Sequence, residues 1–255
     1  MSDKLSFRFE LDPVGEIVPW GEGEDRKLHW FGLTSGRYWI MTPLGEVLRY
    51  TDEACRAWED SSPYVDYQVS RLFEDLQQLL PFVLEPIPED MAAIASDPNW
   101  YARSETWKDS ETGEDGELWF DALAWWHARE MDSAYLRHGL MFRMWRVKDE
   151  VHFQWWYAGN EPVWCVPQGD VILSVDEFSK CAHQFLRGVL AAMELRIDRI
   201  LIDGWTRNDC KLDVAQLARE QVDRTATLDR LERGCAQTDW NKARDLLNEL
   251  CMKVG

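Results

Sequence analysis

Short runs that alternate apolar and polar residues occur in two separate parts of the chain, divided by turns that contain glycine or proline. Alternation with a period of two is typical of strands that bury one face, and short turns favour antiparallel neighbours. The two parts therefore predict two antiparallel β-meanders. The strands of the first meander are expected at residues 7–11, 28–33, 37–42 and 46–51. Those of the second are expected at residues 141–147, 151–157, 163–166 and 170–175.

A helical pattern follows each meander. After the first, apolar residues recur at helical spacing from Val65 to Leu80. Ser62 is the expected N-cap of this helix, and Pro81 is expected to end it. After the second meander, Asp176 is the expected N-cap. A helix packed on a sheet buries the apolar face of both, so each meander and its helix should form a two-layer module. Further helices are expected at residues 118–136, 209–233 and 239–250.

The two meanders also resemble each other in sequence. At an offset of 123–125 residues, His29 matches His152, Trp39 matches Trp164, Pro43 matches Pro167, Gly45 matches Gly169, Val47 matches Val171, and Asp52-Glu53 matches Asp176-Glu177. We interpret these matches as an internal duplication. The sequence thus predicts an α+β fold of two tandem antiparallel β-meander-plus-helix modules with a C-terminal helical segment. The expected domains are residues 1–117, with an acidic loop, and residues 118–255, with the linking helix, or else one fused domain.

The 255-residue chain is strongly acidic: 46 Asp and Glu face 28 Lys and Arg, a formal net charge of −18. Binding to nucleic-acid phosphates needs a surplus of cations, so direct nucleic-acid binding is not expected. The same charge disfavours anionic membrane surfaces, and no stretch is apolar enough to span a bilayer. The six cysteines form no close pairs and no secretion signal is recognised, which indicates a cytoplasmic protein with reduced thiols.

The negative charge is concentrated in residues 1–125, which contain 26 acidic and 10 basic residues. Ten of the acidic residues lie between Glu85 and Glu117, a density that favours a solvated, extended segment. A solubilising loop would explain this charge. The tryptophans within it indicate instead a docking surface for a basic protein, a toxin or effector, because complementary charge speeds encounter and aromatic anchors concentrate binding energy. The predicted partner-binding residues are Trp107, Asp109, Glu111, Glu114, Asp115, Glu117 and Trp119.

The common motifs for nucleotide, zinc and calcium binding are absent from the sequence, so no cofactor, metal site or catalytic residue is predicted. His127 and Glu130 are three residues apart on an expected helix and could form an acid–base pair. A polar helix face explains the same two residues. His29 and His152 occupy matching strand positions, which suggests a shared structural role.

Three aromatic motifs stand out in the first part of the chain. They are Phe7-Arg8-Phe9-Glu10-Leu11 with Pro19-Trp20-Gly21, then Leu28-His29-Trp30-Phe31-Gly32-Leu33-Thr34, then Pro63-Tyr64-Val65-Asp66-Tyr67. Over the first third to half of the chain they resemble a bacterial family catalogued as a domain of unknown function. This resemblance implies a bacterial cytoplasmic protein and transfers no catalytic residue. Acidic, tryptophan-rich α+β proteins of this kind are also similar to bacterial toxin-immunity proteins.

These observations favour a non-enzymatic acidic binding protein, an inhibitor or immunity factor that masks a basic effector protein. Two alternatives stay open. One is a hydrolase-like enzyme that uses His127 with Glu130. The other is a nucleic-acid mimic that inhibits a DNA-binding protein, which would require carboxylates spaced like phosphates along a ridge.

Overall fold

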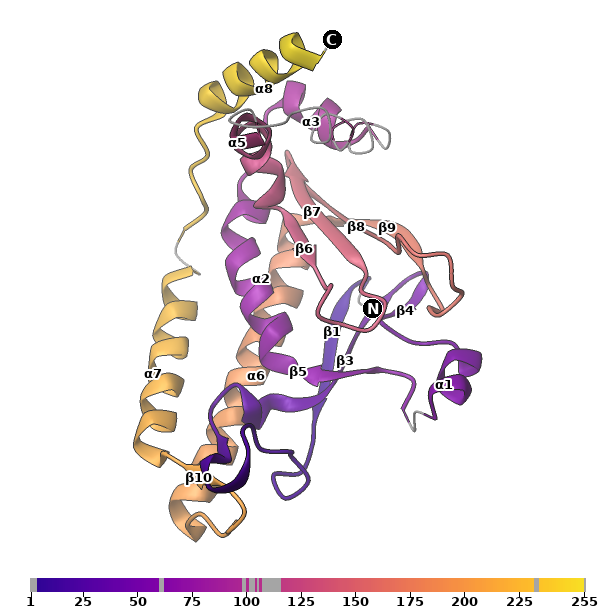
Figure 1. Ribbon diagram of the computed structural model, residues 1–255. Coiled ribbons are helices and arrows are strands. Elements are labelled where there is room, and N and C mark those ends of the chain that lie inside the picture. Colours follow the sequence, from indigo (N-terminus) through magenta and orange to yellow (C-terminus); the bar gives the residue numbers. More distant parts are fainter. Residues whose placement is uncertain are drawn as a thin grey trace.

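The computed structural model describes residues 4–59, 62–97, 100, 104, 106, 116–231 and 234–254. Two antiparallel sheets pack against a layer of long helices, and a smaller group of helices lies at one end of the molecule (Figure 1). The structure thus confirms the expected mixture of helices with antiparallel sheets and the C-terminal helix.

The first sheet is built around β3. Strand β1 pairs with one edge of β3, while β4 and β5 share the other edge. The alternation in β3 accounts for this arrangement, because Tyr38 and Ile40 are buried whereas Trp39 between them is only partly so. The elements are β1 (Ser6–Leu11), β3 (Ser35–Thr42), β4 (Gly45–Val47), α1 (Asp52–Trp58) and β5 (Val65–Gln68).

Two expectations for the first meander are wrong. Residues 28–33 do not form a strand, because backbone bonds from Leu33 to His29 and from Thr34 to Phe31 close a tight turn. Ser62 does not cap a helix, because the alternating residues of β5 pair with β3 instead. The elements observed here are η1 (Gly23–Asp25), β2 (Lys27–Leu28), η2 (Gly32–Thr34) and α2 (Val69–Leu84), which continues through Pro81.

The second sheet is a meander in the order β6-β7-β8-β9. It confirms three of the four expected strands and the hairpin between the first two. The run at residues 163–166 is wrong as a strand, because it forms a loop with one isolated bridge, from Trp164 to Tyr50. The strands are β6 (Glu130–Asp132), β7 (Met141–Val147), β8 (Glu150–Trp156) and β9 (Gln168–Ser174).

Helix α6 (Val175–Asp203) follows β9 without a loop. Its N-cap is Ser174 and not Asp176: the Ser174 side chain accepts a bond from the Glu177 backbone, and the Glu177 carboxylate accepts one from the Ser174 backbone. This reciprocal capping box satisfies two backbone N–H groups at the junction of strand and helix. The correction moves the helix start by two residues.

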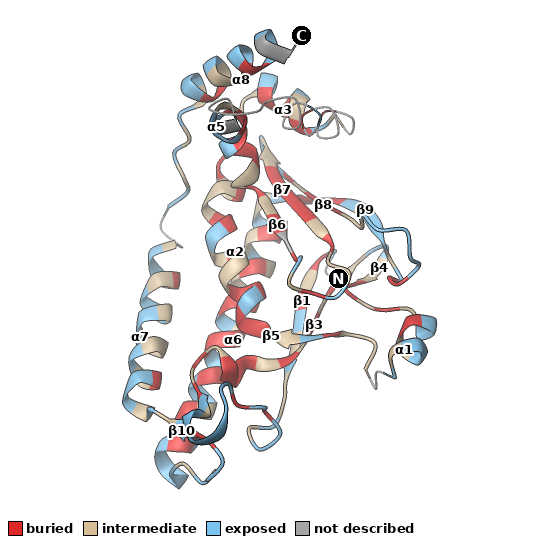
Figure 2. Cartoon of the chain, viewed as in Figure 1, coloured by how far each residue is buried: buried red, intermediate tan, exposed pale blue. Residues whose placement is uncertain are grey.

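Both sheets pack on the layer that α2, α6 and α7 (Val214–Leu231) form side by side (Figure 1). Phe7 of β1 lies against Phe153 of β8 and Phe185 of α6, with ring centroids 6.2 and 5.7 Å away. The buried residues gather on the strands and on the helix faces turned toward them (Figure 2). Residues on both sides of position 117 therefore share one main hydrophobic core.

A second, smaller core lies among α3 (Glu89–Ala95), α5 (Gly116–His127) and α8 (Trp240–Val254). The single helix expected over residues 118–136 is wrong, because the chain turns after His127 and β6 pairs with β7. The helix expected from residue 209 is replaced at its start by β10 (Lys211–Leu212), which pairs with β2. The cap of the last helix is confirmed, since Asp239 accepts a bond from the Lys242 backbone.

A buried ion pair joins the two cores. Arg129 donates to the Glu85 carboxylate at 2.8 Å and to the Trp125 carbonyl at 2.6 Å. Glu85 also accepts a bond from the Thr238 backbone at 2.7 Å, so the pair ties the end of α2 to the turn after α5 and to the segment before α8. Glu85 and α3 correct the expectation that the chain from Glu85 onward is solvated and extended, because Glu85 is buried and residues 89–95 are helical.

No described helix contains an apolar stretch that could cross a lipid bilayer.

A Gly36→Ala variant is expected to lose about 1–3 kcal/mol of unfolding free energy. The added Cβ would overlap the carbonyl oxygen of Glu10 and lie 2.8 Å from the Cα of Leu11, and both are backbone atoms of the paired strand β1. Urea unfolding measures the loss. Gly234→Ala is the control, because a Cβ at that position meets no atom within 4 Å. Equal stabilities for the two variants would contradict the prediction.

Candidate functional site

The structure places two of the seven predicted partner-binding residues. Both Glu117 and Trp119 belong to α5. The remaining five lie outside the described residues, and they are Trp107, Asp109, Glu111, Glu114 and Asp115.

The two faces of α5 differ sharply. Trp119 is only 2% exposed, and its indole N–H donates to the Ser104 carbonyl at 2.7 Å within the second core. In this structure its ring therefore supports the core and does not lie on the surface. Phe120, the next residue, is 55% exposed, and Glu117 and Asp121 are exposed on either side of it at helical spacing.

We call the stripe formed by Glu117, Phe120 and Asp121 the α5 acidic face. Sequence reasoning missed Phe120 as its aromatic residue. The signal that identifies it is the helical phase of α5: Trp119, Leu123 and Trp126 recur at spacings of four and three and point into the core, so residue 120 must point away. Two carboxylates beside an exposed ring give this face the composition that was predicted for a docking surface for a basic protein.

The second predicted site, His127 with Glu130, is assembled in the structure. Their side chains approach to 2.9 Å between Nδ1 and Oε2. Glu130 is nearly buried and also accepts hydrogen bonds from the Trp126 indole at 2.7 Å and from the Arg143 guanidinium at 2.5 Å. The Arg143 guanidinium in turn lies 3.8 Å from the ring centre of Trp126 and 4.9 Å from that of Trp156.

This environment decides the protonation of Glu130. Burial alone would raise its pKa, but the hydrogen bond from His127 and the charge of Arg143 outweigh burial, and the pKa is lowered overall. A carboxylate held ionised by several donors is a weak proton acceptor, because accepting a proton would break these bonds. The geometry therefore favours a structural hub between α5 and the second sheet.

His29 and His152 both pack against tryptophans, but the expectation of matching strand positions is wrong, because His29 lies in a turn and His152 in β8. His29 meets Trp20 edge-on at 4.8 Å, and His152 stacks on Trp145 at 4.9 Å, both between ring centroids. Burial lowers the pKa of each imidazole, which favours the neutral ring. Among the residues that the structure describes, no carboxylate is hydrogen-bonded to either histidine.

His138 belongs to a cluster that sequence reasoning missed. Its ring stacks on Trp58 with centroids 5.3 Å apart, and its Nδ1 lies 2.9 Å from the Tyr157 hydroxyl, which donates to Glu161. The backbone of His138 has a positive φ of 60°, unusual for a residue other than glycine. No signal in the sequence could reveal this cluster, because it joins the end of α1 to two loops that lie about 80 and 100 residues later in the chain.

Within the described ranges, no group of three or more His, Cys, Asp or Glu side chains is arranged to hold a metal ion.

Fold and surface together define an acidic mixed α/β protein in which two antiparallel sheets share one core with a helical layer. The chain belongs to a family of unknown function, DUF5984, whose sequence profile matches residues 6–246. This match confirms the family resemblance and extends it beyond the first half of the chain. No curated protein and no solved structure matches the chain.

Proposed function

We propose that this protein is a non-enzymatic acidic binding protein, an inhibitor or immunity factor that masks a basic effector protein. The observation that carries the proposal is the α5 acidic face, where exposed Phe120 lies between exposed Glu117 and Asp121. In sequence this face directly follows Asp109, Glu111, Glu114 and Asp115. In the sequence, four carboxylates thus precede this face, and two more flank its exposed ring on α5.

The α5 acidic face can contribute both to the rate at which a basic partner associates and to the affinity of the complex. Clustered carboxylates accelerate the encounter with a cationic surface and disfavour anionic partners. An exposed aromatic ring supplies apolar area that the partner can bury, and such anchors dominate the energy of most interfaces. The structural engagement of Glu130 also supports binding over catalysis, because its carboxylate is already committed to three donors.

Affinity capture from the native host, followed by binding measurements on the purified partner, tests the proposal. We expect a basic partner whose affinity falls between about 50 and about 200 mM salt. Phe120→Ala should weaken binding at least about ten-fold. Changing Asp109, Glu111, Glu114 and Asp115 to lysine should abolish binding. Competition by DNA for the captured partner would favour the nucleic-acid mimic instead.

A matched control uses four acidic residues that are exposed elsewhere. Changing Glu16, Glu22, Glu24 and Asp25 to lysine alters the net charge by the same amount and should leave the affinity nearly unchanged. Equal losses in the two quadruple variants would mean that the net charge, and not the position of the four carboxylates between residues 109 and 115, drives the association. Unchanged affinity in the first variant would reject the docking role.

We also propose that the protein acts in the cytoplasm. None of the six cysteines, all of which the structure describes, forms a disulfide, and Cys165, Cys235 and Cys251 are exposed, which suits a reducing compartment. Fractionation of the native host tests this proposal, and recovery outside the cytoplasm would reject it.

The internal duplication is a further proposal. Val47 and Val171 each lie in a strand before a helix whose first turn carries an Asp-Glu pair, Asp52-Glu53 and Asp176-Glu177. Gly45 and Gly169 lie in the same two strands. The histidine and tryptophan matches do not coincide in structure, because His29 lies in a turn and His152 in β8, while Trp39 lies in β3 and Trp164 in a loop. The proposal therefore rests on the strand-to-helix junctions, and a superposition of these junctions in other members of the family would test it.

A further inference from the structure

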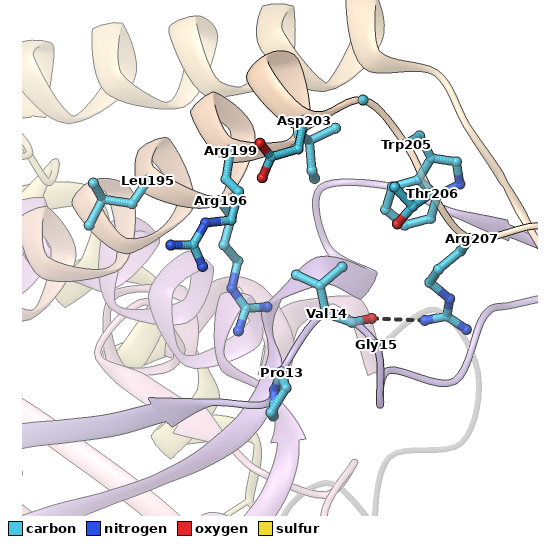
Figure 3. A pocket seen from close by; sticks show the side chains of 12 residues that line it. Pro13, Val14, Gly15, Leu195, Arg196, Arg199, Asp203, Trp205, Thr206 and Arg207 are labelled. Carbon is cyan, nitrogen blue, oxygen red and sulfur yellow. Dashed lines mark hydrogen bonds between the residues drawn. The ribbon is translucent and has the colours of Figure 1, made fainter.

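A cavity lies at the C-terminal end of α6, far from α5 in the molecule (Figures 1 and 3). The last turns of α6, the segment that follows them and the loop after β1 enclose it. Its volume is about 600 Å³, which is in the range of small-molecule sites. The lining combines two chemistries: Pro13, Val14, Leu195, Ile200 and Trp205 are apolar, and Arg196, Arg199 and Arg207 are cationic.

Arg207 is already neutralised and holds the wall of the cavity. Its guanidinium donates to the carbonyls of Val14 and Ile17 at 2.9 and 2.6 Å, and it pairs with Asp209 at 2.7 Å. Figure 3 shows the bond to Val14 across the loop. The clamp keeps the loop after β1 against the segment that follows α6.

Arg196 differs because its partners carry no charge. It donates to the carbonyls of Leu33 and Asp12, and no carboxylate among the described residues forms an ion pair with it. Burial lowers the pKa of this guanidinium, an effect that the more distant charge of Asp12 opposes. Carbonyl groups satisfy the hydrogen bonds of a buried cation, but they leave its charge uncompensated.

Arg199 lies one helical turn further along the same face of α6. Its side chain is exposed and forms no ion pair within the described part of the chain. Asp203, one turn beyond, is the carboxylate that lines the cavity. With Arg207 neutralised by Asp209, the lining of the cavity holds two further guanidinium groups and one carboxylate, and the charge of Asp12, which is not part of the lining, acts on Arg196.

The rim of the cavity is apolar and open to solvent. Leu195, which lines the cavity, is 72% exposed. Ile202 is not part of the lining, but it lies seven residues later on the same side of α6 and is 82% exposed. Exposed aliphatic residues gathered beside a cavity are typical of a binding site.

We propose that this cavity binds a small amphipathic anion, with its charged head on Arg196 and Arg199 and its apolar body against Val14, Ile200 and Trp205. The head would supply the negative charge that Arg196 lacks. The apolar body would be transferred out of water onto the side of the cavity that Trp205 lines. This site is independent of the α5 acidic face, and its ligand has the opposite charge preference.

Calorimetric titration with octanoate tests the site, with 1-octanol as the uncharged probe and acetate as the anion without an apolar chain. We expect octanoate to bind at least about ten-fold more tightly than either comparison probe, because only octanoate engages both walls. No binding of octanoate, or equal binding of octanoate and 1-octanol, would overturn the proposal.

Variants locate the site. Arg199→Gln should weaken octanoate binding about ten-fold or more, and Asp203→Asn should strengthen it because a repelling carboxylate is removed. Gly15→Phe leaves every charge in place but should block binding, because Gly15 lines the cavity and a Cβ there meets no described atom within 4 Å, so that the phenyl ring can fill part of the cavity. Arg219→Gln removes an exposed arginine on α7 and should change nothing.

All four variants replace residues whose side chains form no interaction in the folded chain that the structure shows, so each should keep the wild-type thermal midpoint. Unchanged octanoate affinity in both Arg199→Gln and Gly15→Phe would place any binding elsewhere and reject the cavity as the site.

Discussion

An Arg129→Met variant is expected to lose about 3–5 kcal/mol of unfolding free energy. Arg129 is 1% exposed, and its loss would leave the buried Glu85 carboxylate without the cation that compensates it. The loss of a bond to the Trp125 carbonyl adds to the cost. Guanidinium chloride unfolding, followed by tryptophan fluorescence, measures the change.

A double variant separates charge from packing. Glu85→Gln in the Arg129→Met background keeps an acceptor for the Thr238 backbone but removes the buried charge, so part of the lost stability should return. If the double variant were less stable than Arg129→Met alone, the unpaired charge of Glu85 would not be the cause of the stability lost in Arg129→Met. The Arg129 side chain would then stabilise the fold mainly through its packing and not through its ion pair with Glu85.

Glu130→Ala is the second variant with a large expected effect, again about 3–5 kcal/mol at neutral pH. It would leave the buried Arg143 without its carboxylate and would remove the acceptor of the Trp126 indole. Asp121→Ala removes an exposed acidic residue of the preceding helix α5 and should change stability by less than about 0.5 kcal/mol.

The pH dependence gives an independent check on Glu130. The pKa of Glu130 is lower in the folded chain than in the unfolded chain, where a glutamate has a pKa of about 4.3. The ionised group therefore contributes stability above the unfolded pKa, and this contribution disappears as the pH falls through the lowered folded pKa. The gap between wild type and Glu130→Ala should narrow in that acidic range. A constant gap down to acid unfolding would show that ionisation of Glu130 does not stabilise the fold.

The sequence predicts the second sheet better than the first for a physical reason. The strand at residues 151–157 alternates between buried and partly exposed positions, and a short turn joins it to the apolar run at residues 141–147, so local pattern and long-range pairing agree. Residues 65–68 could extend the helix that follows them or form a strand, and only their pairing with β3 decides in favour of the strand. The same applies after His127, where β6 forms because β7 lies beside it.

The candidate site was predictable in composition but not in geometry. A run of acidic residues and aromatics is visible in the sequence, yet the choice between Trp119 and Phe120 depends on which side of α5 meets the second core. The arginine-lined cavity was not predictable, because its walls come from positions more than 180 residues apart. From the sequence alone, Arg196 looks like an ordinary polar residue of α6, and only its contact with the loop after β1 distinguishes it.

The late position of α8 in the chain has a consequence for biosynthesis. Ala243, Leu247 and Leu250 complete the smaller core around α5 and α3, whose own residues are made about 120–160 positions earlier. Until the ribosome has translated α8, Trp126 and Met91 lack the apolar residues of α8 that complete their core in the folded protein. That interval is when a nascent chain most needs a chaperone, and slowing elongation between the two regions should lengthen it.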